Sequence, residues 1–153
     1  MEQKKEVSGE AIAKSMFEMA KLKVPVIAIV IGEGSSGGAL AIGVANKVYM
    51  LENAIYSILS PEGYSSILWK DSSRYKEAAE KMKLTSKDLY EMNIIDIIIK
   101  EPQTIDDKAF LKITKNIKNE IIQEIEKYKN MTCEEIIENR YNKFRNISGY
   151  KEV

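Results

Sequence analysis

The residues best suited to chemistry lie in a glycine-rich segment, Gly34-Ser35-Ser36-Gly37-Gly38, between an apolar run and an apolar helix. Glycine has no Cβ, so the backbone can turn sharply here and a ligand can come close to its amides. If Gly37 and Gly38 open a helix, their N–H groups lack intrahelical partners and lie at its positive end. Such amides could stabilise an oxyanion, although a tight strand-to-helix turn without a ligand would use the same glycines.

The chain has no histidine and a single cysteine, Cys133. This composition excludes His-based acid–base catalysis, Ser-His-Asp triads and His/Cys zinc sites within the chain. We therefore predict no metal site. A reaction at the glycine-rich segment must take its proton carrier from a substrate, a cofactor or a partner.

The composition, with 153 residues of which 44% are hydrophobic and 30% charged, is that of a globular chain able to bury one core. Its 23 basic and 23 acidic residues are mixed along the sequence, which disfavours nucleic-acid binding. The longest apolar run, residues 24–31, is far shorter than the roughly 20 residues of a membrane span. With no export signal at the start, we expect a cytoplasmic protein without membrane contact.

Apolar periodicity predicts the elements that position the glycine-rich segment. We expect a helix over residues 8–23 with Ser8 as its cap, followed by a strand over 24–31 that is covered on both faces. A short helix over 37–46 should complete this unit. Two further strands are expected over 47–52 and 54–59, separated by a turn.

Capping signals place the helices that come next. Ser60-Pro61-Glu62 combines an N-cap serine, a proline at the first helical position and an early acid, and so predicts a helix through Trp69. Short helices are expected over 74–82 and 87–92. The second has Thr85 and Asp88 in capping-box spacing at its start and a left-handed Asn93 at its end. A strand should then occupy residues 94–99.

Residues 106–153 differ in character from residues 1–105, and we divide the chain there into a helical extension and an α/β core. Isoleucines recur at helical spacing after residue 106, and Thr132 with Glu135 forms a capping box that opens a second helix. The extension could be a packing arm or a surface that docks onto a partner subunit.

Several motifs in this order resemble the carboxyltransferase alpha subunit of bacterial acetyl-CoA carboxylase. The similarity runs from about Glu10 to Pro102, with a weaker match near Asn139-Arg140-Tyr141; its strongest stretches are residues 24–34, 36–44, 50–53, 58–63 and 67–71. The resemblance implies an α/β fold, namely part of a crotonase/ClpP-like spiral of ββα units with a C-terminal helical extension.

The resemblance also implies a reaction: carboxyl transfer from carboxybiotin to acetyl-CoA, giving malonyl-CoA for fatty acid biosynthesis. The biotin is carried on the biotin carboxyl carrier protein and is not attached to this chain. The other implied partner is the carboxyltransferase beta subunit, in an alpha2beta2 assembly. In that family, biotin freed of its carboxyl group takes the acetyl proton, which is compatible with the missing histidines.

Six residues carry the family's site onto this sequence. The resemblance implies that Gly37 and Gly38 are the backbone oxyanion donors. It also implies that the substrate and biotin site includes Gly34, Ser36, Glu62 and Gly63. Glu62 has a simpler explanation as well, because an acid in the first turn of a helix complements the helix dipole.

The sequence departs from the family pattern at four points. Two of them are Tyr64, where the family usually has a smaller residue, and the stretch after Pro102, which lacks the usual glycine-, His- and Arg-containing segment. Ser35 stands where the family has a further glycine, and Met1 falls after the family's upstream strands and their Pro-Gly-Ala-type turn, so we expect about half of the usual subunit to be absent. Two alternatives therefore stay open. The chain could be a non-catalytic assembly module that binds the beta subunit, or a peptidase of the same superfold with Ser36 as nucleophile and a lysine base.

Overall fold

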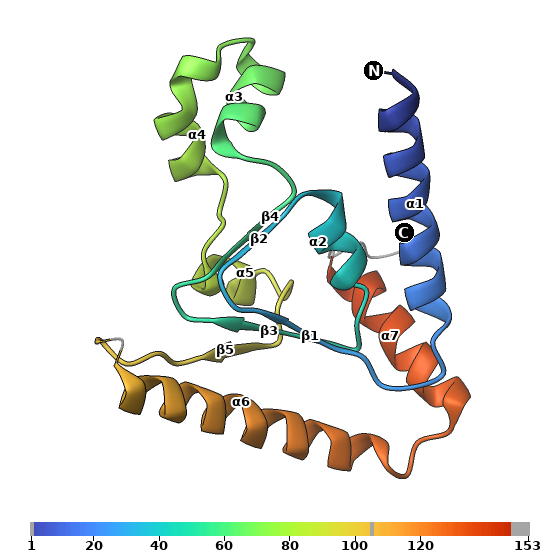
Figure 1. The fold of residues 1–153 in the computed structure, drawn as a ribbon. Helices are drawn as coiled ribbons and strands as arrows, with labels where there is room; N and C mark the ends of the chain where they lie inside the picture. Colours follow the sequence, from blue (N-terminus) through green and yellow to red (C-terminus); the bar gives the residue numbers. More distant parts are fainter. Residues whose placement is uncertain (1, 105, 148–153) are drawn as a thin grey trace.

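Two successive strand–strand–helix units form the core of the computed structural model, which describes residues 2–104 and 106–147 (Figure 1). The first unit is β1 (Ile27–Val30), β2 (Glu33–Ser35) and α2 (Ser36–Ile42); the second is β3 (Lys47–Leu51), β4 (Ile55–Ser57) and α3 (Pro61–Trp69). β3 pairs in parallel with β1 on one side and with β5 (Ile97–Ile99) on the other, and β2 pairs in parallel with β4. This stacking of ββα units confirms the predicted partial spiral.

The core is centred on β3, the middle strand of the larger sheet. Val48, Tyr49 and Met50 are at most 3% exposed, and Leu89 and Ile99 pack with them. In β1, by contrast, only Ala28 is buried. The prediction that this strand is covered on both faces holds only in part, because Ile27, Ile29 and Val30 pack against the core but are only half-buried.

Several predicted boundaries are also wrong. β1 begins at Ile27 and not at residue 24, and β4 ends at Ser57 and not at residue 59. α1 (Glu2–Lys21) begins before Ser8, so Ser8 is not its cap; the side chain of Ser8 lies outside what the structure describes. α2 ends at Ile42 and not at residue 46. The chain has to turn after Ile42, because the amides of residues 46 and 47, where β3 begins, donate to the Val26 carbonyl. β5 starts only at Ile97, because the amides of residues 94 and 95 donate to the Leu89 carbonyl.

The predicted caps are confirmed where the signals are local. The Ser60 hydroxyl accepts from the amide at the third position of α3, and Thr85 does the same for α5 (Ser86–Glu91). Asn93 has φ 58°, the left-handed conformation expected after α5. α4 (Tyr75–Lys81) also lies where predicted, whereas the short 3-10 helix η1 (Ser72–Arg74) was not foreseen.

The two C-terminal helices pack onto the α/β core. α6 (Asp107–Tyr128) runs alongside β5, and its Ile113 and Ile117 contact the core (Figure 1). α7 (Cys133–Ile147) begins at the predicted capping box: the Thr132 amide donates to the Glu135 carboxylate at 2.7 Å, and the Glu135 amide donates to the Thr132 hydroxyl at 3.2 Å. α7 returns to lie against α1.

Arg140 of α7 joins three parts of the chain in a group that we call the Arg140 clamp: Arg140, Asn46 and the carbonyls that Arg140 binds. Its guanidinium, in a side chain only 2% exposed, donates to the Asn46 carboxamide oxygen and to four backbone carbonyls, those of Met19, Ala20, Leu22 and Val24. The first two belong to the last turn of α1, where carbonyls lack intrahelical partners and a cation is favoured. Burial lowers the pKa of Arg140.

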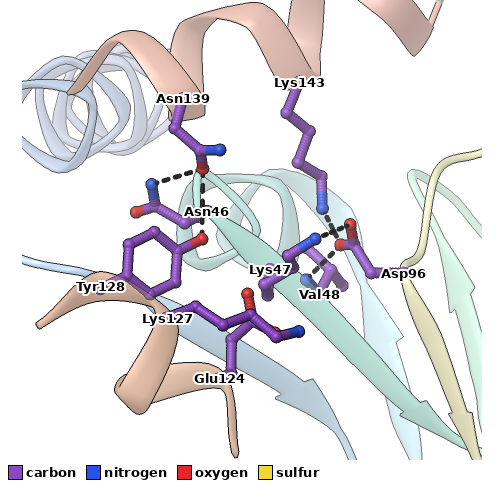
Figure 2. Close-up of polar contacts among 9 residues, drawn as sticks. All are labelled: Asn46, Lys47, Val48, Asp96, Glu124, Lys127, Tyr128, Asn139 and Lys143. Atoms are coloured by element: carbon purple, nitrogen blue, oxygen red, sulfur yellow. Dashed lines mark hydrogen bonds and ion pairs between the residues drawn. The ribbon is translucent and has the colours of Figure 1, made fainter. Parts of the chain in front are cut away.

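Further polar contacts tie the helical extension to the sheet (Figure 2). The Asn46 amide donates to the Asn139 oxygen at 3.1 Å, and the Tyr128 hydroxyl donates to the same oxygen at 3.2 Å. Nearby, the Asp96 carboxylate accepts from the Val48 amide and from the side chains of Lys47 and Lys143. These contacts fix α6 and α7 on β3 and on the segment that precedes β5.

Candidate functional site

The glycine-rich segment forms the junction between β2 and α2, as its sequence predicted. The turn itself falls on Ser36, which has φ 69°. A left-handed conformation costs a non-glycine residue about 1–2 kcal/mol. The backbone therefore reverses at a serine, and the two glycines that follow form the first turn of α2.

The amides of Gly37 and Gly38 lie at the second and third positions of α2. Ser35, the N-cap, makes no side-chain hydrogen bond to them. Within residues 2–104 and 106–147, no backbone oxygen outside α2 accepts from either amide. Both N–H groups are therefore available to an external acceptor, as an oxyanion site requires.

The surroundings of these two glycines differ. A Cβ on Gly37 would lie 2.9 Å from the Cδ1 atom of Ile12, so Gly37 lets α1 pack closely against α2. A Cβ on Gly38 would meet no atom within 4 Å. Gly38 instead faces an open groove between α1 and α2, lined also by Ser15 and Met19. The space beside the Gly38 Cα is therefore open, whereas α1 fills the space beside Gly37.

Gly34 and Ser36 have different surroundings again. Gly34 lies on β2, where an added Cβ would come within 3.0 Å of the Tyr56 ring and 3.2 Å of Val30. Its lack of a side chain makes room for that ring. The Ser36 side chain is exposed, and in the described part of the chain no lysine hydrogen-bonds to its hydroxyl.

Glu62 and Gly63 lie at the start of α3, which follows the same carboxyl-terminal end of the β2–β4 sheet as the glycine-rich segment. This follows from the parallel ladder, in which Ser35 and Ser57 are partners at the carboxyl ends of β2 and β4. The Gly63 amide donates to the Ser60 hydroxyl at 3.2 Å and so serves the helix cap. The Glu62 side chain is exposed in the first turn of α3.

Tyr56 of β4 is a residue that the sequence analysis did not single out. Its hydroxyl donates to the Ala39 carbonyl at 3.2 Å, and its ring contacts Gly34. A Cβ on Gly43 would lie 2.3 Å from the same hydroxyl. Burial raises the pKa of Tyr56. The Tyr56 side chain therefore fixes the position of α2 relative to β4. Its only signal in the sequence was an aromatic residue in a short apolar run.

Tyr56 lines three cavities, the largest of which, about 840 Å³, lies between α1, α2 and α7. The other two adjoin the predicted site. One, of about 170 Å³, lies under the β1–β2 connection and is lined by Ile31, Gly34 and Ile42 among others. The other, of about 270 Å³, lies between the two predicted site motifs, with Leu40 of α2 and Tyr64 of α3 in its wall.

The part of the chain that the structure describes has neither a cluster of metal-ligating side chains nor a membrane-spanning helix. No group of three potential metal-ligating side chains occurs there. None of the helices in that part is long and apolar enough to cross a bilayer.

Comparison with known proteins identifies relatives along most of the chain. A family model described as acetyl co-enzyme A carboxylase carboxyltransferase-like matches residues 1–148. The acetyl-coenzyme A carboxylase carboxyl transferase subunit alpha of Clostridium perfringens is 56% identical over 141 residues, which are 92% of this chain and 52% of that protein. The subunit of the same name from Staphylococcus haemolyticus is 51% identical over 149 residues, 94% of this chain and 46% of that protein. The chain thus spans about half the length of these relatives.

Solved structures with the same fold have low sequence identity. A Pseudomonas malonate decarboxylase hetero-tetramer in complex with coenzyme A aligns with a TM-score of 0.66 at 12% identity, covering 92% of this chain and 57% of that one. Transcarboxylase 12S aligns with a TM-score of 0.57 at 20% identity, covering 76% of this chain and 22% of that one. These likenesses confirm the predicted partial crotonase-type fold.

Proposed function

This chain belongs to the acetyl-CoA carboxylase carboxyltransferase-like family, and from that premise we propose that it supplies the glycine-rich oxyanion site of a carboxyltransferase alpha subunit. The proposed reaction moves a carboxyl group from carboxybiotin to acetyl-CoA and yields malonyl-CoA for cytoplasmic fatty acid biosynthesis. The observation that carries the proposal is the pair of unpartnered amides at Gly37 and Gly38, at the end of β2.

The chain's own contribution is a main-chain one. The Gly37 and Gly38 amides stabilise negative charge on the ureido oxygen, and neither amide has a backbone acceptor outside α2 among the described residues. Tyr56 and Ile12 fix the position of α2 and hence of both amides. When bound, carboxybiotin supplies the carboxyl group and, once that group has left, the base for the acetyl methyl proton. No side-chain base on this chain is required.

Gly34, Ser36, Glu62 and Gly63 have supporting places in this proposal. Gly34 admits the Tyr56 ring, and Ser36 makes the turn that presents the two donor amides. Glu62 lies beyond the carboxyl ends of β2 and β4, and its exposed carboxylate is free to contact substrate. The Gly63 amide is used by the helix cap, so its part in the site is to hold the start of α3 in place.

The partners in the proposal are the beta subunit and the biotin carboxyl carrier protein, in an alpha2beta2 assembly. The relatives' name, subunit alpha, supports a multisubunit enzyme, and the similarly folded malonate decarboxylase is a hetero-tetramer. We assign acetyl-CoA mainly to the beta subunit, so that the site is shared across an interface. Biotin reaches it on the carrier protein.

The test compares Gly38→Val with Gly9→Val in malonyl-CoA-dependent carboxylation of free biotin. The reaction contains the beta subunit and the remaining half of the alpha subunit from Clostridium perfringens. A Cβ meets no atom within 4 Å at either glycine, so both variants should fold. Valine keeps the backbone N–H at position 38, but its branched side chain enters the open groove beside this residue and restricts approach to the donor. Because one such donor is worth about 3 kcal/mol, turnover should fall up to about 100-fold in Gly38→Val and stay near wild type in Gly9→Val.

Equal turnover in the two variants would contradict the oxyanion role. Binding to the beta subunit without any turnover would instead favour the non-catalytic assembly module. The peptidase alternative gains no support from the structure, because the described residues provide no lysine bonded to the Ser36 hydroxyl. It would be revived by labelling with a serine-directed phosphonate that is lost in Ser36→Ala.

A further inference from the structure

The helices α3 and α4, with η1 between them, form a small body that we call the α3–α4 hairpin, residues 60–82. Figure 1 shows the two helices side by side and apart from the sheets. Ser65 of α3 and Ala78 of α4 are 0% exposed, and the Trp69 ring lies 4.2 Å from the Arg74 guanidinium. The hairpin therefore has a buried centre of its own.

The polar contacts of the α3–α4 hairpin all stay within it. Glu77 pairs with Arg74 and with Lys81, and the Ser60 hydroxyl caps α3. Within the part of the chain that the structure describes, no hydrogen bond or ion pair joins residues 60–82 to any other residue. The C-terminal helices, in contrast, are bonded to the rest of the core by several side chains.

Where the α3–α4 hairpin faces the core, apolar side chains line a cavity of about 270 Å³. Leu40 of α2 and Leu89 of α5 line it on the core side, and Tyr64 and Met82 line it on the hairpin side. A void between side chains forfeits the dispersion contacts that would hold two bodies together. The hairpin is therefore held to the core mainly by its two chain connections.

Both of these connections are suited to act as hinges. On one side, residues 58–59 follow β4, and Ile58 is 58% exposed. On the other side Lys83 has φ 52°. The next residue is already fixed on the core, because the Tyr56 amide donates to the Leu84 carbonyl at 3.2 Å. Hinges are a few residues at the ends of elements that absorb changes in φ and ψ.

We propose that the α3–α4 hairpin is a hinged lid, which turns as one body about residues 58–59 and Lys83 and opens or closes the cavity between α2 and α3. Glu62 at the start of α3 travels with the hairpin, whereas the Gly38 amide stays with the core. The motion therefore changes the distance between the two halves of the candidate site. That consequence rests on the proposed function, but the motion itself does not.

The test measures distances between pairs of spin labels by pulsed electron paramagnetic resonance in this chain. It uses a Cys133→Ser background, because the single cysteine is exposed and would take up label. The pair Ser66→Cys with Lys87→Cys spans the hinges from α3 to α5. Two control pairs, Ser66→Cys with Glu80→Cys and Lys87→Cys with Lys118→Cys, lie within the hairpin and within the core. All four labelled positions are exposed. We expect two populations of distance across the hinges and a single sharp distance for each control pair.

A wedge in the cavity should shift the balance between the two populations. Leu40→Trp places a larger side chain between α2 and α3 and should lower the population of the shorter distance about fivefold. Met82→Trp, which enters the same cavity from the hairpin side, should act in the same direction. The control, Leu111→Trp, enlarges a side chain that is 67% exposed on α6 and should leave both populations unchanged. Circular dichroism melting checks that each variant folds.

Three results would overturn the proposal. A distance across the hinges as sharp as those of the controls would mean that the hairpin is fixed on the core. A broad distance within the hairpin would indicate local unfolding instead of motion as one body. Equal responses to Leu40→Trp and Leu111→Trp would separate the motion from the cavity. The distances are measured without substrate or partner, so a rigid hairpin would leave the oxyanion role and its Gly38→Val test untouched.

Discussion

The stretches on either side of α2 are built in opposite ways. Before the helix, the glycine-rich segment offers backbone amides with no acceptor outside α2 among the described residues, and Gly38 faces open space. After the helix, Asn46 is 1% exposed and bonds to Val26, Ile136, Asn139 and Arg140. In the first stretch the Gly37 and Gly38 amides are unused as hydrogen-bond donors. In the second stretch the Asn46 side chain is fully used as donor and acceptor.

This difference separates stability from function along a short length of chain. Buried polar groups stabilise a fold only when their hydrogen bonds are complete, so removing one member of the Arg140 clamp should be costly. Unpartnered amides at the surface add little to stability and can serve a ligand. Substitutions in the two stretches should therefore move different observables.

The largest expected effect is that of Arg140→Met, which tests the clamp. It removes a charged donor from four part-buried carbonyls and from the Asn46 oxygen, which keeps only the Val26 amide as a donor, so the free energy of unfolding should fall by about 3 kcal/mol or more. The control is Arg74→Met, which removes an exposed 2.6 Å ion pair with Glu77 and should cost less than about 1 kcal/mol. Urea denaturation measures both, and equal losses would contradict the clamp's importance.

A smaller effect with a distinctive pH dependence is expected for Tyr128→Phe. Burial, aided by Glu124 and Asp96, raises the pKa of Tyr128 from 10.0 to about 12. Above pH 10 the unfolded chain loses this proton while the folded chain keeps it, so the stability that Tyr128 contributes is present below pH 10 and lost toward pH 12. The slope is up to about 1.4 kcal/mol per pH unit.

In Tyr128→Phe this slope should become shallower between pH 10 and 12. At pH 7 the variant should lose about 1 kcal/mol, because the hydrogen bond to Asn139 is gone. Tyr141→Phe, at an exposed tyrosine of α7, is the control and should leave both the slope and the pH 7 stability unchanged. Chemical denaturation at a series of pH values measures the slope, and parallel curves for the wild type and Tyr128→Phe would contradict the linkage.

The two stretches also differ in how far the sequence could predict them. The turn before α2 and the caps at Ser60, Thr85 and Thr132 depend on residues within four positions of each other, and all were predicted. The Arg140 clamp joins residues 94 positions apart. Hydrophobic periodicity carries no information about such a pair. The weak family match near Arg140 singled out this part of the chain but did not indicate that Arg140 binds Asn46.

The failed predictions have a related physical reason. The sequence shows that residues 24–31 are apolar, but burial of β1 depends on which segment occupies its outer side. Tyr56 likewise gained its place from the parallel pairing of β2 with β4, which brings its ring against Gly34. Local patterns therefore predicted the elements, whereas the contacts between them had to come from the structure.

The smallest expected effect distinguishes the two glycines of the proposed oxyanion site. Gly38→Ala meets no neighbour, so the free energy of unfolding should stay within about 0.5 kcal/mol of wild type. Gly37→Ala brings a methyl group to 2.9 Å from Ile12 Cδ1 and should be about 1 kcal/mol less stable than Gly38→Ala. In an Ile12→Ala background, which lacks the Cδ1 atom and also the Cγ2 atom at 3.3 Å, thermal melting should show the two alanine variants to be equally stable. A difference that persists there would mean that Gly37 is required for its backbone and not for the packing of α1 against α2.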